Sequence, residues 1–235
     1  MDSSMTVLLA TAASIGFFHT LTGPDHYLPF IVIGRARGWS LLRTTILTVI
    51  CGIGHVGSSV VIGGIGIALG LFLGKLEFLE GVRGNLAAWA LIAFGLVYAV
   101  WGFKKAMSGK KHEHRHDHAD GAQHSHEHAH RAGHAHVHGD TKSITPWMLF
   151  IIFVLGPCEP LIPILMYPAA KQSVWGIVAV SIVFAAATIF TMTAIVIIAS
   201  LGVNALPLGR VERYSHALAG LAICLSGVAI QFLGL

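Results

Sequence analysis

The sequence predicts an all-α, polytopic membrane protein with six transmembrane helices, arranged as two inverted three-helix repeats in which helices 1 and 4 are broken by proline. Only 11% of the 235 residues are charged, whereas a soluble domain carries about 25%. Hydrophobic residues make up 54% of the chain and fall in runs long enough to cross a bilayer. The composition therefore excludes ordinary soluble, disordered and disulfide-scaffold classes.

Hydropathy and length divide the chain into three spans before a polar segment and three after it. Gly23-Pro24 interrupts the first span and Gly156-Pro157 interrupts the fourth, because proline lacks the N–H that continues a helix. The expected spans cover residues 5–33, 41–73, 86–103, 146–169, 174–201 and 216–233. The expected units are a first transmembrane repeat at 1–103, a loop at 104–145 and a second repeat at 146–235.

The segment 104–145 differs from the rest in composition and has no apolar periodicity, which predicts disorder. Eleven histidines alternate there with other residues, and neutral imidazoles bind borderline divalent ions readily. We therefore expect this loop to bind metal. Its histidines are His112, His114, His116, His118, His124, His126, His128, His130, His134, His136 and His138.

Positive charges predict the orientation. Twelve Lys and Arg follow the first, third and fifth spans, against three after the second and fourth. The positive-inside rule then places the histidine loop in the cytoplasm and both termini outside, in a multi-pass protein of the cytoplasmic membrane. Since the basic residues lie at the ends of apolar runs, we expect the lipid bilayer as a partner and no nucleic acid.

Two similar segments suggest the internal repeat. Gly23-Pro24-Asp25-His26-Tyr27-Leu28-Pro29 is matched 133 positions later by Gly156-Pro157-Cys158-Glu159-Pro160-Leu161-Ile162-Pro163. With three spans in each half, the second half must be inserted upside down. Inverted repeats with broken first helices are typical of secondary transporters, whose substrate site lies near the breaks.

Ionisable residues beside the breaks are the expected site, since such groups inside a membrane are costly and usually functional. Imidazole with carboxylate suits nickel, cobalt or zinc better than magnesium or calcium. We expect a transported ion, no permanently bound cofactor and no enzymatic activity. The predicted ligands are His19, Asp25, His26, His55 and Glu159, with Cys158, Thr188 and Cys51 as additional lining.

At residues 18–26 and 156–163 the chain resembles the nickel/cobalt transporter superfamily, and most closely its urease-accessory-type nickel permease branch, often labelled sulfite-exporter-like. The resemblance covers both halves and implies transport of nickel or cobalt, with the first-helix histidine and Asp25-His26 essential. Five residues separate His19 from Asp25 here, whereas the permease motif has four. A cytoplasmic metallochaperone is a candidate partner.

Three alternatives remain open. The Gly-Pro-Cys segment at 156–158 is also similar to the membrane electron carriers of cytochrome c maturation, which use one cysteine in each half. Asp25 stands where the partner of Cys158 would be, so only Cys51 could complete a pair. The others are an exporter of a small anion such as sulfite, and a metal store or sensor acting through the loop alone.

Overall fold

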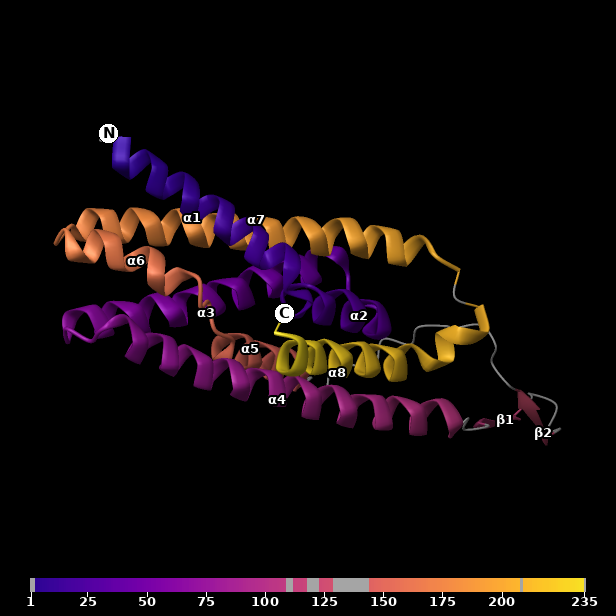
Figure 1. The fold of residues 1–235 in the computed structure, drawn as a ribbon. Coiled ribbons are helices and arrows are strands. Elements are labelled where there is room, and N and C mark those ends of the chain that lie inside the picture. Colours follow the sequence, from indigo (N-terminus) through magenta and orange to yellow (C-terminus); the bar gives the residue numbers. More distant parts are fainter. Residues whose placement is uncertain (1–2, 109–111, 118–122, 129–143, 208, 235) are drawn as a thin grey trace.

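A computed structural model describes residues 3–108, 112–117, 123–128, 144–207 and 209–234 as an elongated helical bundle (Figure 1). The membrane part is built entirely of helices. In chain order the elements are α1 (Ser3–Thr22), η1 (Pro24–His26), α2 (Leu28–Arg37), α3 (Leu41–Ala68), α4 (Leu73–Met107), β1 (His112–Asp117), β2 (Gln123–His128), α5 (Thr145–Leu155), α6 (Leu161–Ala170), α7 (Val174–Ala205), η2 (Gly209–Tyr214) and α8 (Ser215–Leu233).

Five helices among the described residues are long and apolar enough to cross a bilayer: α1, α3, α4, α7 and the stretch Val211–Leu233 that contains α8. The predicted fourth span is instead two short apolar helices, α5 with 11 residues and α6 with 10. Neither alone reaches the roughly 20 residues that a crossing needs. The membrane class is confirmed, whereas the count of six spans remains a prediction.

The third span is longer than expected. α4 begins at Leu73 and has 35 residues, so the whole stretch 74–85 that separates predicted spans two and three is helical, and the helix begins before the predicted span start at residue 86. Glu80 and Arg83 lie in this additional stretch. They pair with each other inside the bundle, which offsets part of the cost of burying either charge.

The described residues within 104–145 have regular structure, and the expectation of disorder for the segment as a whole remains a prediction. α4 continues to Met107, and β1 pairs with β2 in an antiparallel ladder that sets His112 opposite His128. Every second residue of each strand is a histidine, and this period of two matches a strand. Because the repeating residues are polar, the segment has no apolar periodicity. His118, His130, His134, His136 and His138 lie outside the described residues.

The two helix breaks occur where the Gly-Pro pairs predict them. α1 ends at Thr22, and Gly23 is extended at φ −88° and ψ 99° before the short turn η1. α5 ends at Leu155, and Gly156 is extended at φ −61° and ψ 134°. In both places proline removes the next helical N–H, so the chain leaves the helix and resumes it several residues later.

The broken segments lie along the long helices of the opposite half. α1 packs on the first part of α7, where Gly176 adjoins Met5. α2 reaches the C-terminal end of α7, where Arg35 donates to the Asn204 backbone carbonyl at 3.3 Å. α5 and α6 likewise follow α3. The two broken segments run in opposite directions (Figure 1), as inverted halves would. The inverted repeat itself remains a prediction.

The remaining helix of each half packs against its counterpart through glycine. A Cβ on Gly220 of α8 would overlap the backbone of Ala99, and one on Gly95 of α4 would overlap the backbone of Cys224. Small residues let membrane helices approach closely where no hydrophobic force drives them together. The α4–α8 contact therefore depends on these glycines.

Replacing Gly220 with alanine should destabilise the protein by about 1–3 kcal/mol, because the added methyl group meets backbone that cannot move aside. Gly202→Ala in α7 is the matched control, since a Cβ there meets nothing within 4 Å and alanine favours helix over glycine. Thermal unfolding in detergent measures both. Equal stability of the two variants would contradict the close α4–α8 packing.

Candidate metal centre

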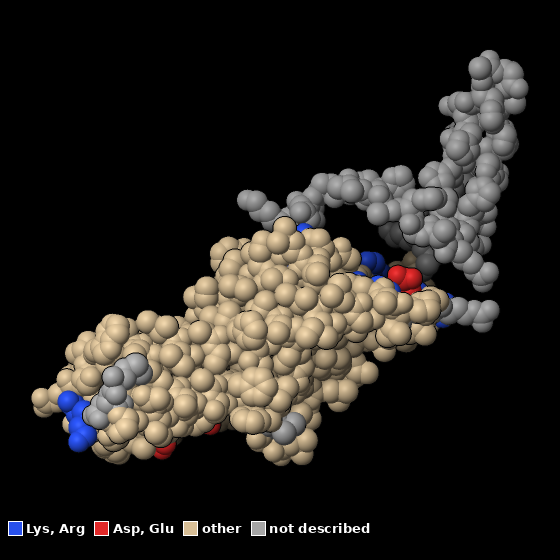
Figure 2. Space-filling model, turned by 90° about the horizontal axis from the view of Figure 1, so that it is seen from above, with Lys and Arg blue, Asp and Glu red and all other residues tan. Residues whose placement is uncertain are grey.

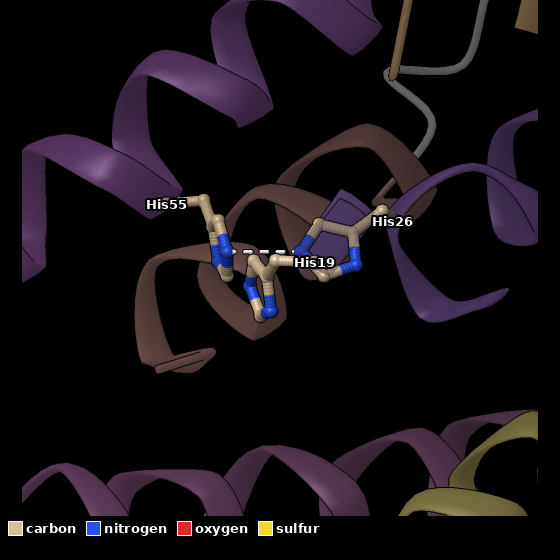
Figure 3. A group of neighbouring side chains, drawn as sticks. All are labelled: His19, His26 and His55. Atoms are coloured by element: carbon tan, nitrogen blue, oxygen red, sulfur yellow. Dashed lines mark hydrogen bonds between the residues drawn. The ribbon is translucent and has the colours of Figure 1, made fainter. Parts of the chain in front are cut away.

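Three histidines from separate elements meet at the first helix break. His19 lies in the last turn of α1, His26 ends η1 and His55 is in the middle of α3. Each offers a ring nitrogen within 4.8 Å of the other two, the only such group of three or more potential ligands found among the described residues. Figure 3 shows the rings converging, with the Nε2 atoms of His26 and His55 3.2 Å apart.

The outer nitrogens of two of these rings are held by hydrogen-bond acceptors. His55 Nδ1 donates to the Phe153 carbonyl at 3.2 Å. His26 Nδ1 lies 3.1 Å from the Gly23 carbonyl and 3.2 Å from a carboxylate oxygen of Asp25. A neutral ring that carries its proton on Nδ1 presents a lone pair at Nε2. Two lone pairs therefore face each other, an arrangement that a proton or a metal ion between them satisfies.

Both Gly-Pro pairs make room for an imidazole. A Cβ on Gly23 would lie 2.5 Å from His26 Nδ1, and one on Gly156 would lie 3.0 Å from His55 Nδ1. Each glycine therefore lets a histidine approach the backbone at a break. The same feature that interrupts the helix thus also positions a ring of the cluster.

His19 completes the group from the other side. Its Nε2 is buried and has no hydrogen-bond partner in the described structure. Its ring lies edge-on to His26 with centroids 4.7 Å apart and is nearly parallel to His55 with centroids 6.4 Å apart. A buried polar atom without a partner is costly, and the ring that carries it offers a nitrogen within 4.8 Å of the other two histidines.

A cavity of about 440 Å³ adjoins the cluster and brings in the predicted carboxylates. His19, Asp25 and His26 line it from the first break, and Glu159 lines it from the second. Asp25 is one-quarter exposed and Glu159 is exposed. Both predicted acids thus border the water-accessible side of the histidines, and Asp25 also holds the His26 ring.

The other predicted lining residues do not line this cavity. Cys158 is fully buried in an apolar group with Val56 and Phe184, and Cys51 belongs to a second apolar group around Phe30. Thr188 is buried with an unpartnered hydroxyl but does not line the cavity. All three cysteines are free thiols.

Sequence reasoning missed the pair Glu80 and Arg83, which holds the second break together. Arg83 donates to the carbonyls of Val154 at 2.8 Å and Gly156 at 3.1 Å and pairs with the fully buried Glu80. The Cys158 N–H is held by Glu80 at 3.2 Å and by the Ser59 hydroxyl at 3.1 Å. An acid and a base three residues apart in an apolar stretch were the available signal.

Comparison with known proteins identifies the family. The sequence profile described as "Cytochrome C biogenesis protein transmembrane region" matches residues 31–234. The chain belongs to this family. No curated protein and no solved structure matches this chain.

Membership of this family supports the similarity to the electron carriers more directly than the similarity to nickel permeases. The matched stretch begins at residue 31, so it contains His55, Cys158 and Glu159 but not His19, Asp25 or His26. It thus covers the second break and leaves out the first. The family assignment therefore fixes the membrane class and does not cover His19 and His26 of the histidine cluster.

Arg83→Gln should destabilise the protein by about 3–5 kcal/mol, because Glu80 is left buried without its partner. The measurement is thermal unfolding in detergent. Replacing both residues by glutamine should restore much of the loss, since no uncompensated charge then remains. Lys75→Gln, on the exposed surface of the same helix, is the control. An Arg83→Gln variant as stable as this control would show that the pair does not hold the break.

Proposed function

We propose that this protein transports a divalent transition-metal ion, nickel or cobalt, across the cytoplasmic membrane. The observation that carries the proposal is the buried group of three imidazoles, in which His26 Nε2 and His55 Nε2 face each other 3.2 Å apart. Metal-bound histidines commonly donate their other N–H to a carboxylate or a carbonyl, which fixes the ring for binding. Both of these rings are held in that way.

The spacing of the rings suits a borderline metal. Metal–nitrogen bonds of about 2.0–2.1 Å place two ligand nitrogens roughly 3 Å apart, close to the separation of the His26 and His55 nitrogens. Three imidazoles leave positions for water, so the ion is held without being enclosed. Because all the cluster ligands are nitrogens, nickel, cobalt and zinc are the expected candidates, and the similarity to nickel permeases favours the first two.

The cavity offers a path to the cluster. Glu159 and Asp25 attract a hydrated cation into it, and the ion exchanges part of its water for imidazole nitrogens of His19 and His26. Small movements of the broken segments along α7 and α3 would then change which side has access, as in other transporters with discontinuous helices. Two carboxylates at the entrance speak against a small anion as substrate.

The membrane potential can drive entry. Two charges moving through 100 mV gain about 4.6 kcal/mol, at 2.3 per charge, which favours inward movement more than a thousandfold without a coupled ion. The predicted cytoplasmic loop would then receive the metal, for storage or transfer to a metallochaperone. We propose import for this reason.

His26→Ala should lower nickel or cobalt accumulation to the level of cells that lack the protein, because one of three ligands is lost together with the partner of His55. The measurement is elemental mass spectrometry of cells grown in mixed trace metals, at equal abundance of each variant in the membrane. His216→Ala is the matched control, since His216 lies outside the cluster and should leave accumulation unchanged. Retained accumulation by His26→Ala would refute the assignment, whereas a fall in metal with the native protein would reverse the direction.

The second candidate function is transfer of electrons between thiols, which the family assignment favours. It requires Cys158 and Cys51 to form and break a disulfide. Disulfide geometry needs Cα atoms within about 7 Å, and each thiol is packed in a different apolar group. Ser59, which holds the Cys158 N–H, lies eight residues after Cys51 on α3, about 12 Å along the helix axis.

Cys158→Ser separates the two functions. We expect this variant to accumulate metal like the native protein, because serine occupies nearly the same space and the backbone N–H of residue 158 remains. Mass analysis after alkylation should find three reduced thiols in the native protein taken directly from cells. Loss of metal accumulation in Cys158→Ser, together with a disulfide between Cys51 and Cys158 in the native protein, would favour electron transfer instead.

A further inference from the structure

A cationic cavity lies at the end of the bundle where α2 gives way to α3. It has a volume of about 520 Å³ and is separate from the histidine cluster. Its main side chains come from α2, the α2–α3 turn, α3, α4 and α8. They are Arg37, Trp39, Arg43, Trp101, Lys105 and His216. No Asp or Glu is among the described residues that line it.

Neutral groups hold the cations in place. The Arg43 guanidinium lies over the Trp39 ring, 5.1 Å from its centroid, and the Lys105 ammonium lies over the Trp101 ring at the same distance. Lys105 Nζ also donates to His216 Nε2 at 3.2 Å. Aromatic rings and a neutral imidazole orient a cation without cancelling its charge. Arg43 and Lys105 therefore keep their positive charges beside the cavity.

The ring of His216 is itself fixed. Because Nε2 accepts from Lys105, the ring proton lies on Nδ1, which is 2.9 Å from the Tyr98 hydroxyl. Lys105 uses one N–H on this imidazole and has two left for another acceptor. The guanidinium of Arg37 lies over the Tyr98 ring at 5.8 Å and adds a third cation to the cavity wall.

The position of the cavity indicates the ligand. It lies near the ends of α2 and α4, whose last turns carry Arg35, Arg37, Lys104 and Lys105. Figure 2 shows Lys and Arg toward both ends of a largely uncharged surface, with some Asp and Glu exposed as well. Trp39 and Trp101 are of the type that gathers at the level of lipid headgroups. Basic pockets between transmembrane helices on the cytoplasmic side bind phosphate-bearing headgroups. A phosphate offers several acceptor oxygens to donors that converge from different helices.

We propose that this cavity binds a phosphate group, supplied in the membrane by the headgroup of an anionic phospholipid. Arg43 and Lys105 are the principal ligands, with Arg37 as a third, and His216 positions Lys105. The proposal is independent of metal transport, since none of these residues belongs to the histidine cluster.

The test is binding to the purified full-length protein in detergent, measured as the rise in unfolding temperature with added phosphatidylglycerol, phosphatidylcholine or inorganic phosphate. The double variant Arg43→Gln, Lys105→Gln should need at least tenfold more phosphatidylglycerol for the same rise, since each cation near an anionic headgroup contributes about 1 kcal/mol. Lys75→Gln with Lys171→Gln removes two exposed cations elsewhere and should bind like the native protein.

Phosphatidylcholine should stabilise all variants equally. A phosphatidylglycerol effect that inorganic phosphate does not reproduce supports the lipid as source, whereas an equal effect of inorganic phosphate supports the site but assigns it a soluble anion. Unchanged phosphatidylglycerol binding in the Arg43→Gln, Lys105→Gln variant, or equal loss in the control, would overturn the proposal. If the double variant does not fold, the single variant Lys105→Gln replaces it, because Lys105 is exposed on α4. It should also bind phosphatidylglycerol more weakly than the control variant does.

Discussion

Every backbone amide and carbonyl inside a bilayer needs a partner, and the structure depends on how this requirement is met at two broken helices. At the first break the Gly23 carbonyl is bonded by the backbone N–H and the imidazole of His26, and the Tyr27 hydroxyl donates to the Leu21 carbonyl at 3.3 Å. At the second, His55 binds the Phe153 carbonyl and Arg83 binds two more. Two of the residues that could hold a metal are thus also the residues that close the breaks.

The class of the protein and the places of its breaks could be predicted from the sequence because both rest on local chemistry. Apolar runs require a bilayer, and a Gly-Pro pair ends a helix wherever it stands. The sequence predicted a common site for His19, Asp25, His26, His55 and Glu159 because ionisable residues stand beside both breaks, and the structure brings the three histidines together. The sequence could not show which residues touch, and Glu159 was grouped with the ligands although it lies at the cavity and outside the three-nitrogen cluster.

Hydropathy does not indicate the early start of α4, because it counts each charge separately. Glu80 and Arg83 are one hydrogen-bonded unit with Ser59 and the second break, and such a unit costs far less than two isolated charges. Its partners lie more than twenty residues away on α3 and more than seventy away at the α5–α6 break. No local pattern carries that information. The strands β1 and β2 were not predicted for a different reason. Their repeating residue is histidine, which is polar, so hydropathy does not indicate a strand.

The two breaks are held by different chemistry, and this difference bears on function. Arg83 and Glu80 close the second break with an ion pair and several bonds to the backbone. The first break is held by the imidazole of His26, whose Nδ1 serves the backbone and Asp25 while its Nε2 faces the other histidines. A cation bound at Nε2 leaves the Nδ1 contacts in place. The cluster can therefore gain or lose an ion without exposing an unsatisfied backbone group to the membrane, as the proposed transport of a metal requires.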